Sequence, residues 1–519
     1  MTTSNVRDVH LLVCVHGMWG VPDHLLSVQR TIRERFPKTT NGTELSTVLV
    51  RTNANSFTYD GLDWGAERAV KEVFQAVEEI EKDGSKKVTR FSIVGYSLGG
   101  LISRYAIGIL YERGFFKTVR PVNFTTFSTP HIGLLRSKGV LARIMFTLIP
   151  KMLSRTGRQF YSVDNELWSP DTKQRRPLLA VMTDKDSVFF KALSAFPHIT
   201  IYGNAVHDLT VPYCTSMIEP HNPFTVLSSK RNRLAIKMDT EYRHVISSFY
   251  DVPEGEDVPV HDLAKERQAE RDAIPWYNPM KYRGDRPLLP PQLQLEFPLN
   301  IILYLLLPLL IPIGIVYATL RVRRQSAESQ KRLAELAASP EAELTLGAAL
   351  RSRTSLAIPA DIDPTSPGAM ARPKRDEGQG QEEKLEIELK RRSSPESELE
   401  RGTGTGTLRS RVPSPSPDVR TSTITTEPMA PADPTADPKN LVLRTTPDLS
   451  DPSQPIFTPS QLEMISSLNS IPQLRKVRAY FPFVRNAHTV IVARDSGVLP
   501  PNDDGVSVLK HWADRFVLD

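Results

Sequence analysis

The sequence predicts an α/β fold, a mostly parallel sheet covered by helices, over residues 1–250. Two observations predict it. Short apolar runs alternate with segments of helical periodicity, and one run leads into a glycine-flanked serine that a helical pattern follows. A helix is expected over residues 65–81, which carry apolar side chains on one face. The runs expected as strands are Leu11–Val15, Thr47–Val50, Phe91–Val94, Val122–Phe127, Leu178–Met182 and Ile199–Tyr202.

The pentapeptide Gly95-Tyr96-Ser97-Leu98-Gly99 fits the G-x-S-x-G pattern, which places a serine nucleophile on a sharp turn between a strand and a helix. The context is the one that the pattern requires. Phe91–Val94 reads as a buried strand, and the residues after the serine recur at helical spacing. Ser97 is therefore the candidate nucleophile, and a purely structural turn is the alternative.

A nucleophilic serine needs oxyanion donors, a base and a carboxylate that orients the base. The segment His16-Gly17-Met18 follows the first strand, so the expected oxyanion donors are the backbone N–H groups of Met18 and Leu98. The expected acid is Asp208, because it follows Ile199–Tyr202 and the loops at the carboxyl ends of parallel strands carry the site in such sheets. The alternatives for the acid are Asp251 and Asp186.

Two histidines compete for the role of base. His244 lies 36 residues after Asp208, whereas His488 lies 280 residues after it. The local context favours His488, which follows an expected strand and precedes the final helix. The long separation is acceptable because the cost of loop closure grows slowly with length. His488 is the expected base and His244 the alternative, while His207 and His511 are expected to be structural.

The rest of the chain divides by composition. Residues 251–296 are polar and interrupted by proline, and are expected as an irregular connector. Residues 325–455 are rich in Ser, Thr, Pro, Glu and Arg, so they cannot bury enough apolar surface to offset the entropy of ordering. They are expected as a disordered linker that includes a fraying helix over 328–350. The protein partners of this linker are unknown.

Residues 456–519 regain a globular pattern and are expected to complete the core of residues 1–250. The spacing of Leu462, Met464, Ile465 and Leu468 predicts a helix, Val477–Phe481 reads as a strand, and a last helix is expected near 505–516.

Residues 297–320 form an apolar run that is long enough to cross a bilayer as a helix. Pro308 and Pro312 interrupt its middle, and basic residues flank both ends. Ser97 and Asp208 precede the run and His488 follows it, so a single crossing would separate the base from the nucleophile. We therefore expect a hairpin that returns to its starting face, with arms Leu299–Leu307 and Ile313–Leu320. A buried core segment is the alternative.

Residues 138–154 repeat apolar side chains at helical spacing with basic residues on the other face. This pattern predicts an amphipathic helix that serves as a lid or an interfacial patch, and a core-facing helix is the alternative.

Composition narrows the class of protein. The net charge of +6 is mildly basic and suits an anionic membrane surface, but no basic patch with interleaved aromatic residues is visible, so no nucleic-acid partner is expected. The two cysteines, Cys14 and Cys214, are too few for a disulfide framework and fit a reducing compartment. The first residues lack the pattern of a signal peptide. No cofactor and no metal are expected.

Five motifs together resemble those of the fungal serine esterases that include the lipid-droplet phospholipase. They are His16-Gly17-Met18-Trp19-Gly20, Thr58-Tyr59-Asp60-Gly61, Gly95-Tyr96-Ser97-Leu98-Gly99-Gly100, Thr129-Pro130-His131-Ile132-Gly133 and Asn486-Ala487-His488. The resemblance covers about 1–250 and 456–519. It implies an α/β-hydrolase fold and the hydrolysis of acyl esters of glycerolipids, and it supports Ser97 as nucleophile and His488 as base.

The sequence thus predicts a lipase or phospholipase that acts at a membrane or lipid-droplet surface. The expected location is the cytosolic face of a membrane, either the lipid droplet or the endoplasmic reticulum. Two alternatives remain open: a protein or thioester deacylase with the same triad, and a catalytically silent tether at a lipid surface.

Overall fold

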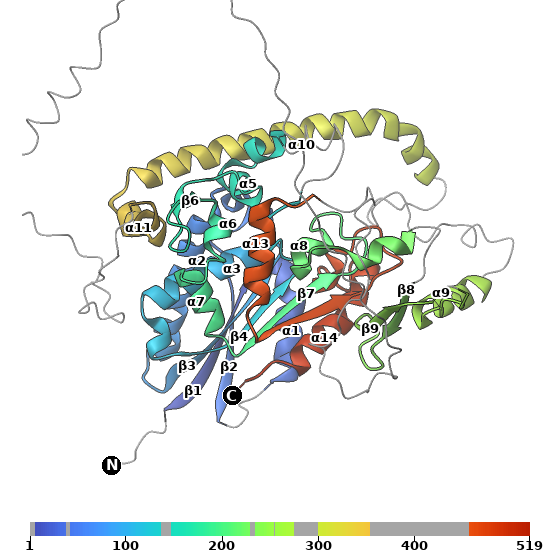
Figure 1. Ribbon diagram of the computed structural model, residues 1–519, viewed down its shortest axis with the longest axis horizontal. Helices are drawn as coiled ribbons and strands as arrows, with labels where there is room; N and C mark the ends of the chain where they lie inside the picture. The colour runs from blue at the N-terminus through green and yellow to red at the C-terminus, as the bar shows by residue number, and fades with distance from the viewer. Residues whose placement is uncertain are drawn as a thin grey trace, which may run out of the picture. The chain divides into compact units, whose positions relative to one another are not determined.

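The computed structural model describes residues 6–37, 42–135, 147–228, 234–253, 255–273, 299–352 and 456–518. Its centre is a six-stranded sheet with the order β10-β7-β4-β3-β1-β2, in which every neighbouring pair is parallel (Figure 1). The predicted α/β class is therefore confirmed. The strands of this sheet are β1 (Arg7–Val15), β2 (Thr43–Leu49), β3 (Lys86–Tyr96), β4 (Arg120–Phe127), β7 (His198–Asn204) and β10 (Leu474–Ala479).

Helices cover both faces of this sheet, because alternate residues of its central strands point to opposite sides. In β1, Val9, Leu11, Val13 and Val15 pack into one apolar core, whereas Leu12 and Cys14 pack into another. The first core includes residues of α2 (Leu62–Glu81), α3 (Leu98–Glu112), α6 (Leu178–Val181), α7 (Val188–Ser194) and α13 (Pro459–Asn469). The second includes residues of α1 (Leu26–Arg35) and α14 (Val506–Asp514).

The remaining elements are shorter, apart from one long helix. A two-stranded antiparallel ribbon pairs β8 (Leu234–Met238) with β9 (Ile246–Asp251), and a second pairs β5 (Leu167–Trp168) with β6 (Arg175–Arg176). The other helices are α5 (Ser154–Phe160), α8 (Tyr213–Met217), α9 (Asp262–Ala273), α10 (Leu299–Ala337) and α11 (Leu346–Ser352).

The C-terminal segment completes the sheet of the N-terminal one. β10 pairs in parallel with β7 along its whole length, and α13 enters through a capping box made by Thr458 and Gln461. The amide of Gln461 also donates to the carbonyl of Ile132, in the loop after β4. Residues 456–518 are therefore an integral part of this core, and the loop after β10 is carried to the carboxyl edge of the sheet.

Two local predictions are wrong. Leu178–Met182 was expected as a strand, but residues 178–181 form α6 in the first core, because a short apolar run has no periodicity that separates a buried helix from a strand. Residues 251–296 were expected as an irregular connector, but α9 occupies Asp262–Ala273 and buries Leu263. Alanine, glutamate, glutamine and arginine dominate α9, and these residues have high helix propensity. Residues 274–296 lie outside the described residues.

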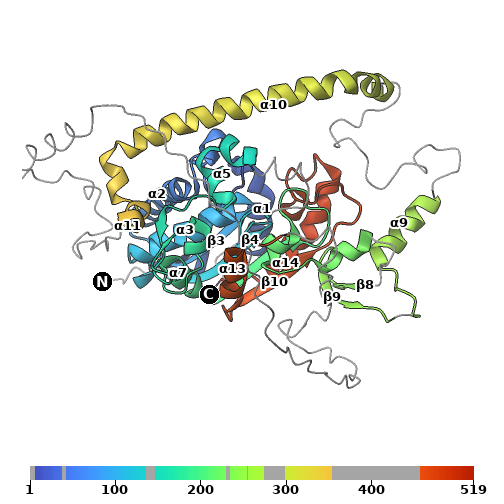
Figure 2. The ribbon, with the colours of Figure 1, turned by 45° about the horizontal axis from the view of Figure 1, so that its top comes forward.

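The predicted hairpin is also wrong. Residues 299–337 form one continuous helix, α10, with Pro308 and Pro312 inside it (Figures 1 and 2). Each proline removes one backbone N–H donor, and the remaining backbone hydrogen bonds keep the helix continuous across both prolines. The same helix, with α11, contradicts the start of a disordered linker at residue 325. Residues 325–352 are mostly helical and Leu346 is buried in the first core, whereas residues 353–455 lie outside the described residues.

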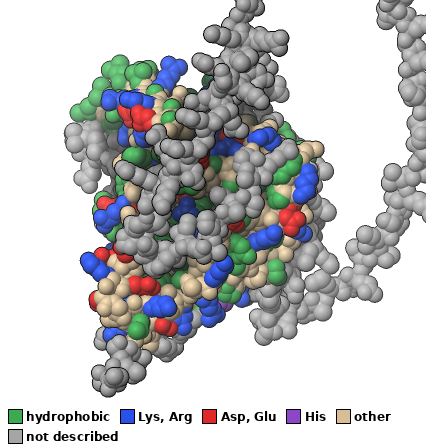
Figure 3. Space-filling view, turned by 90° about the vertical axis from the view of Figure 1, so that its left-hand side faces the viewer, with side chains coloured by type: hydrophobic (Ala, Val, Ile, Leu, Met, Phe, Trp, Pro, Cys, Tyr) green, Lys and Arg blue, Asp and Glu red, His purple; other side chains and the backbone are tan. Residues whose placement is uncertain are grey.

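Much of the amphipathic helix predicted over 138–154 also lies outside the described residues, which resume at residue 147 with a helical turn that leads to α5. Among the described residues, one helix, Leu305–Ala337, is long and apolar enough by length and composition to cross a membrane. Its most apolar window has a mean hydropathy of 2.0 and is not buried. On the face drawn in Figure 3, Lys and Arg side chains lie among Asp and Glu side chains rather than in one patch.

Candidate active site

Ser97 lies on a sharp turn between β3 and α3, with φ of 55° and ψ of −123°. A non-glycine residue rarely adopts this backbone conformation, and the surrounding contacts hold it in place. The Ser97 N–H donates to Phe127 O at 2.9 Å, and Ser97 O accepts from Thr129 Oγ1 at 3.0 Å. Close packing explains the flanking glycine Gly99, because a Cβ there would lie 2.0 Å from Val15 O. The turn therefore presents Ser97 at the carboxyl edge of the sheet.

The structure brings Ser97, His488 and Asp208 into one chain of hydrogen bonds. His488 Nε2 lies 3.1 Å from Ser97 Oγ, and His488 Nδ1 lies 3.1 Å from Asp208 Oδ2. An ionised carboxylate only accepts, so Nδ1 carries the proton and Nε2 is free to accept from the serine hydroxyl. All three side chains are buried or nearly so. This geometry suits transfer of the serine proton to the imidazole.

Asp208 is held as a carboxylate by its neighbours. Oδ2 also accepts from Ser128 Oγ and Asn204 Nδ2, each at 2.8 Å, and Oδ1 accepts from the N–H of Val211 at 2.8 Å and of Thr210 at 3.0 Å. Burial alone would raise the pKa of Asp208, but the adjacent His488 ring and these donors outweigh it and lower the pKa below its ordinary value. Asp208 therefore stays charged at neutral pH and can stabilise a protonated His488.

The expected oxyanion donors also lie beside the serine. The loop after β1 approaches so closely that a Cβ on Gly17 would lie 2.8 Å from Ser97 Cβ. Among the described residues, neither the N–H of Met18 nor the N–H of Leu98 has a hydrogen-bond acceptor. Leu98 is the first residue of α3, where N–H groups have no partner within the helix. Two free donors beside a buried serine are what an oxyanion hole requires.

Four residues that support the triad were missed by sequence reasoning. Tyr96 donates its hydroxyl to His488 O at 3.0 Å, and its ring centre lies 5.1 Å from that of His488. Asn486 Oδ1 accepts from the N–H groups of His488 and Leu209, and so ties the base loop to the acid loop. Ser128 and Asn204 contact Asp208. Ser128 and Asn204 could have been predicted from the sequence, because each is a polar residue at the carboxyl end of a strand of the sheet. Asp208 was predicted on the same ground, from its place shortly after such a strand.

The alternative residues lie elsewhere. His244 stacks on Phe481, and its Nδ1 lies 3.2 Å from Ser507 Oγ. Burial lowers the pKa of His244 to about 4, which makes it a poor base. His207 contacts Phe481 O, and His511 contacts the Tyr202 hydroxyl. Asp251 ends β9, and the N–H of Asp186 donates to Asp171.

Replacing Gly17 by alanine should sharply lower the reactivity of Ser97 toward esters, because the added methyl group would push against Ser97 and displace the Met18 N–H. We expect a loss on the order of 100-fold in kcat, since a shift of about 1 Å at a reacting centre has that effect. The measurement is the steady-state rate on a soluble aryl ester. Gly65→Ala is the matched control, because its Cβ would meet side-chain atoms alone, of Ile102 at 3.1 Å and of Asn53 at 3.6 Å. Equal rates for Gly17→Ala and wild type would contradict this placement of the loop.

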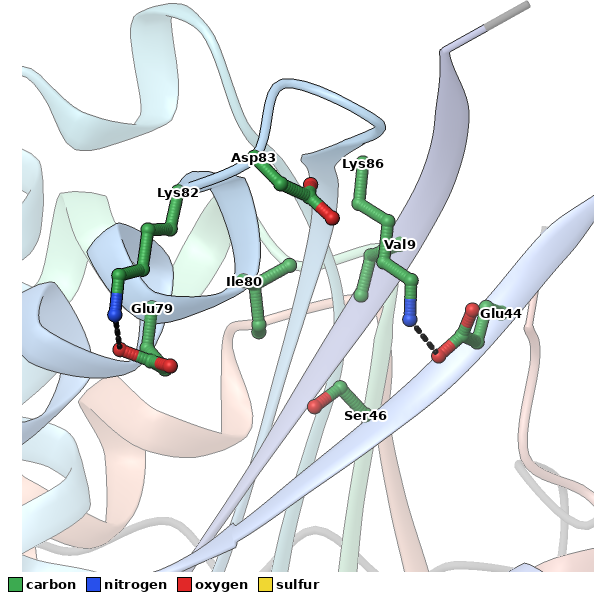
Figure 4. A pocket seen from close by; sticks show the side chains of 8 residues that line it. All are labelled: Val9, Glu44, Ser46, Glu79, Ile80, Lys82, Asp83 and Lys86. Carbon is green, nitrogen blue, oxygen red and sulfur yellow. Dashed lines mark hydrogen bonds and ion pairs between the residues drawn. The ribbon is translucent and has the colours of Figure 1, made fainter.

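The hollow drawn in Figure 4 is not part of this site. It has a volume of about 360 Å³ and lies at the amino ends of the strands, where Lys86 pairs with Glu44 and Lys82 with Glu79 (Figure 4). A second hollow, of about 510 Å³, lies between the acid loop and α9 and is lined by His207, His261 and Tyr480 among others. Among the described residues, no group of three or more His, Cys, Asp or Glu side chains is arranged to hold a metal ion.

Comparisons of the sequence with known families agree with this geometry. Residues 5–219 match the family described as "Putative serine esterase (DUF676)". The matched segment contains the serine turn, the oxyanion loop and Asp208. The match covers less than half of the chain. The segment with His488 lies beyond the match, and the sheet pairing of β10 with β7 brings it to the matched segment.

Two curated fungal relatives match at modest identity. The "Putative lipase C4A8.10" of Schizosaccharomyces pombe is 26% identical over 221 residues, which cover 41% of this chain and 26% of the relative. The "Putative lipase ROG1" of Saccharomyces cerevisiae is 26% identical over 221 residues, which cover 42% of this chain and 29% of the relative. The match to this chain therefore spans less than a third of the length of each of these relatives.

Solved structures add a weaker likeness. Carboxyl esterase 2 from the mycorrhizal fungus Tuber melanosporum is 14% identical, with 39% of this chain and 59% of that chain covered and a TM-score of 0.23. At that score the likeness carries no argument. The α/β-hydrolase fold is instead shown by the order of the parallel sheet and by the strained serine turn between β3 and α3.

Proposed function

We propose that the protein hydrolyses acyl esters of glycerolipids at a membrane or lipid-droplet surface, with Ser97, His488 and Asp208 as its catalytic triad. The observation that carries the proposal is the unbroken chain of hydrogen bonds from Ser97 Oγ through the His488 ring to Asp208. Beside the serine lie two N–H donors that have no acceptor among the described residues. This arrangement suits acyl transfer and requires no metal or cofactor.

In this mechanism Ser97 Oγ attacks the ester carbonyl while His488 Nε2 takes the hydroxyl proton. The N–H groups of Met18 and Leu98 stabilise the oxyanion, and His488 then gives the proton to the leaving alcohol. A water molecule attacks the acyl-enzyme in the second half of the cycle, when His488 again takes a proton and returns it to Ser97. Asp208 holds the imidazole in orientation and stabilises its charged form throughout.

The exposed first half of α10 supports a lipid surface as the place of action. Residues 302–320 are almost all apolar, and Leu305, Leu309 and Ile315 are more than half exposed. A contiguous apolar surface of this kind is costly in water and marks a site for a membrane or another apolar partner. Lysine and arginine residues just outside the run would favour an anionic lipid surface.

The chain packs on the core both before and after the apolar half of α10, which favours contact of α10 with a lipid surface from one side only. Leu263 in α9 is buried in the core before α10, and the second half of α10 packs against the core after it. A crossing would need a second membrane-spanning segment between residues 274 and 298. That stretch contains five charged residues, Lys281, Arg283, Asp285, Arg286 and Glu296, and has no apolar run of the required length. We therefore propose that α10 enters the lipid surface from the cytosolic side without crossing it.

A lipid-class assay tests the proposed substrate. The purified full chain is incubated with phospholipid vesicles, triacylglycerol emulsions and, separately, an acyl-thioester peptide, and the released fatty acids are quantified. The proposal predicts release from a glycerolipid that Ser97→Ala abolishes. Release from the thioester alone would favour the deacylase, and no release with any ester would favour a silent tether.

A further inference from the structure

The second half of α10 packs against the core around the six-stranded sheet, whereas the first half is exposed. Ser329 is fully buried, and its hydroxyl lies 3.1 Å from that of Ser154 in α5. α10 also contacts the short turn Asn55–Tyr59, which follows β2 at the carboxyl edge of the sheet. This docked half comes from a part of the sequence far from every catalytic motif.

Arg332 makes the most specific contact of the docked half. Its guanidinium donates to both carboxylate oxygens of Asp60, at 2.9 and 3.3 Å, and to Ser56 O at 2.9 Å. The guanidinium carbon also lies 4.6 Å from the centre of the Phe57 ring. The Asp60 side chain is fully buried, so its charge must be compensated. Arg332 therefore links the two ends of the turn of residues 55–60 to α10.

The same turn holds the loop that carries Met18. The N–H of Trp19 donates to Thr58 Oγ1 at 3.2 Å, and the indole N–H of Trp19 donates to the Tyr59 hydroxyl at 2.7 Å. The N–H of Asn55 donates to Gly20 O at 2.9 Å. Trp19 has a φ of 54°, a conformation that needs support from its neighbours. Three hydrogen bonds thus join the turn to the residues directly after Met18.

We propose that Arg332 is a positioning residue for the oxyanion hole: from α10 it locks the turn of Asp60, and that turn holds the loop 17–20 so that the Met18 N–H points at the developing oxyanion. The inference rests on the proposed function and extends it to a helix outside the matched family segment. Arg332 touches no reacting atom, and it acts through Asp60, Thr58 and Trp19.

Arg68 makes this proposal testable without loss of the fold. Its guanidinium donates to Asp60 Oδ2 at 3.0 Å and to Phe57 O at 2.9 Å. When Arg332 is removed, Asp60 keeps one cationic partner and is not left as an isolated buried charge. The turn should then loosen while the domain stays folded.

The test compares Arg332→Ala, Arg332→Lys and the control Arg324→Ala in the full chain, on p-nitrophenyl butyrate and its thiono analogue. The Arg324 side chain is 84% exposed, and its partner among the described residues is Glu328 on the same helix. Arg332→Ala should lower kcat for the ester on the order of 10- to 100-fold with KM unchanged. Arg332→Lys should recover part of the rate, and Arg324→Ala should match wild type.

The thiono analogue separates positioning from mere stability. Sulfur accepts hydrogen bonds more weakly than oxygen, so an ordered oxyanion hole prefers the ester, and a disordered one should reduce the ratio of the ester rate to the thionoester rate. Assays run well below the unfolding transition, which is measured for each variant. An unchanged kcat in Arg332→Ala, or a reduced kcat with an unchanged ratio, overturns the inference. Failure of wild type itself to cleave the ester would instead refute the proposed function.

Discussion

Ser97→Ala is expected to lower kcat on esters on the order of 10⁴- to 10⁶-fold, because it removes the atom that forms the acyl-enzyme. The fold should tolerate the change. Ser97 is held in the turn through its main-chain N–H and carbonyl, which alanine keeps, and within the described part of the chain its side chain makes one hydrogen bond, to His488. The measurement is the initial rate on p-nitrophenyl butyrate and on the best glycerolipid.

A matched pair of histidine variants sharpens this result. His488→Ala should lose nearly as much rate as Ser97→Ala, since residues of a triad act as a unit. His244→Ala removes the other histidine that the sequence offered as base, and it should keep the chemistry because His244 contacts Ser507 and Phe481 instead. If His244→Ala were inactive while folded and His488→Ala active, the assignment of the base would be reversed.

A second large effect is expected at the lipid surface. The triple variant Leu305→Asp, Leu309→Asp, Ile313→Asp places three charges on the exposed half of α10, where the side chains are 76%, 61% and 56% exposed. On insertion scales an aspartate costs about 3 kcal/mol at the centre of a membrane helix, so binding to phosphatidylcholine vesicles should fall by on the order of 100-fold or more. Flotation of the full chain with these vesicles measures the effect, and hydrolysis of vesicle lipid should fall with it.

The control for this variant carries the same added charge elsewhere. Val260, Leu344 and Val498 are also more than half exposed, and all three lie outside the apolar half of α10. Aspartate at these three positions should leave vesicle binding unchanged. Both triple variants should cleave a soluble ester at the wild-type rate, because the docked half of α10 and Arg332 are intact. Equal flotation of the two variants would show that α10 is not the lipid-contacting element.

The core of the fold follows from local patterns. β1, β3, β4 and β7 were predictable because each buried strand is a short apolar run that ends in a loop, and the serine turn has its own signature. His488 could be predicted despite its distance along the chain, since its context between a strand and a helix is local. Leu178–Val181 could not, because periodicity does not separate a short buried helix from a strand.

Other features depend on contacts that no local pattern contains. The prolines of α10 favoured a break, but each removes only one N–H donor, and the hydrogen bonds of the other residues keep the helix continuous. The pairing of Arg332 with Asp60 joins residues 272 positions apart. No sequence pattern around Arg332 or Asp60 predicts that the two residues pair. Only the folded chain shows that α10 reaches the turn beside the oxyanion loop.

The most direct test of the catalytic assignment is the reaction of the full chain with a fluorophosphonate probe, followed by mass spectrometry of the labelled peptide. Only an activated serine should react rapidly. The triad predicts one adduct, on Ser97, that is absent in Ser97→Ala and strongly slowed in His488→Ala. An adduct on another residue, or equal labelling of wild type and Ser97→Ala, would contradict it.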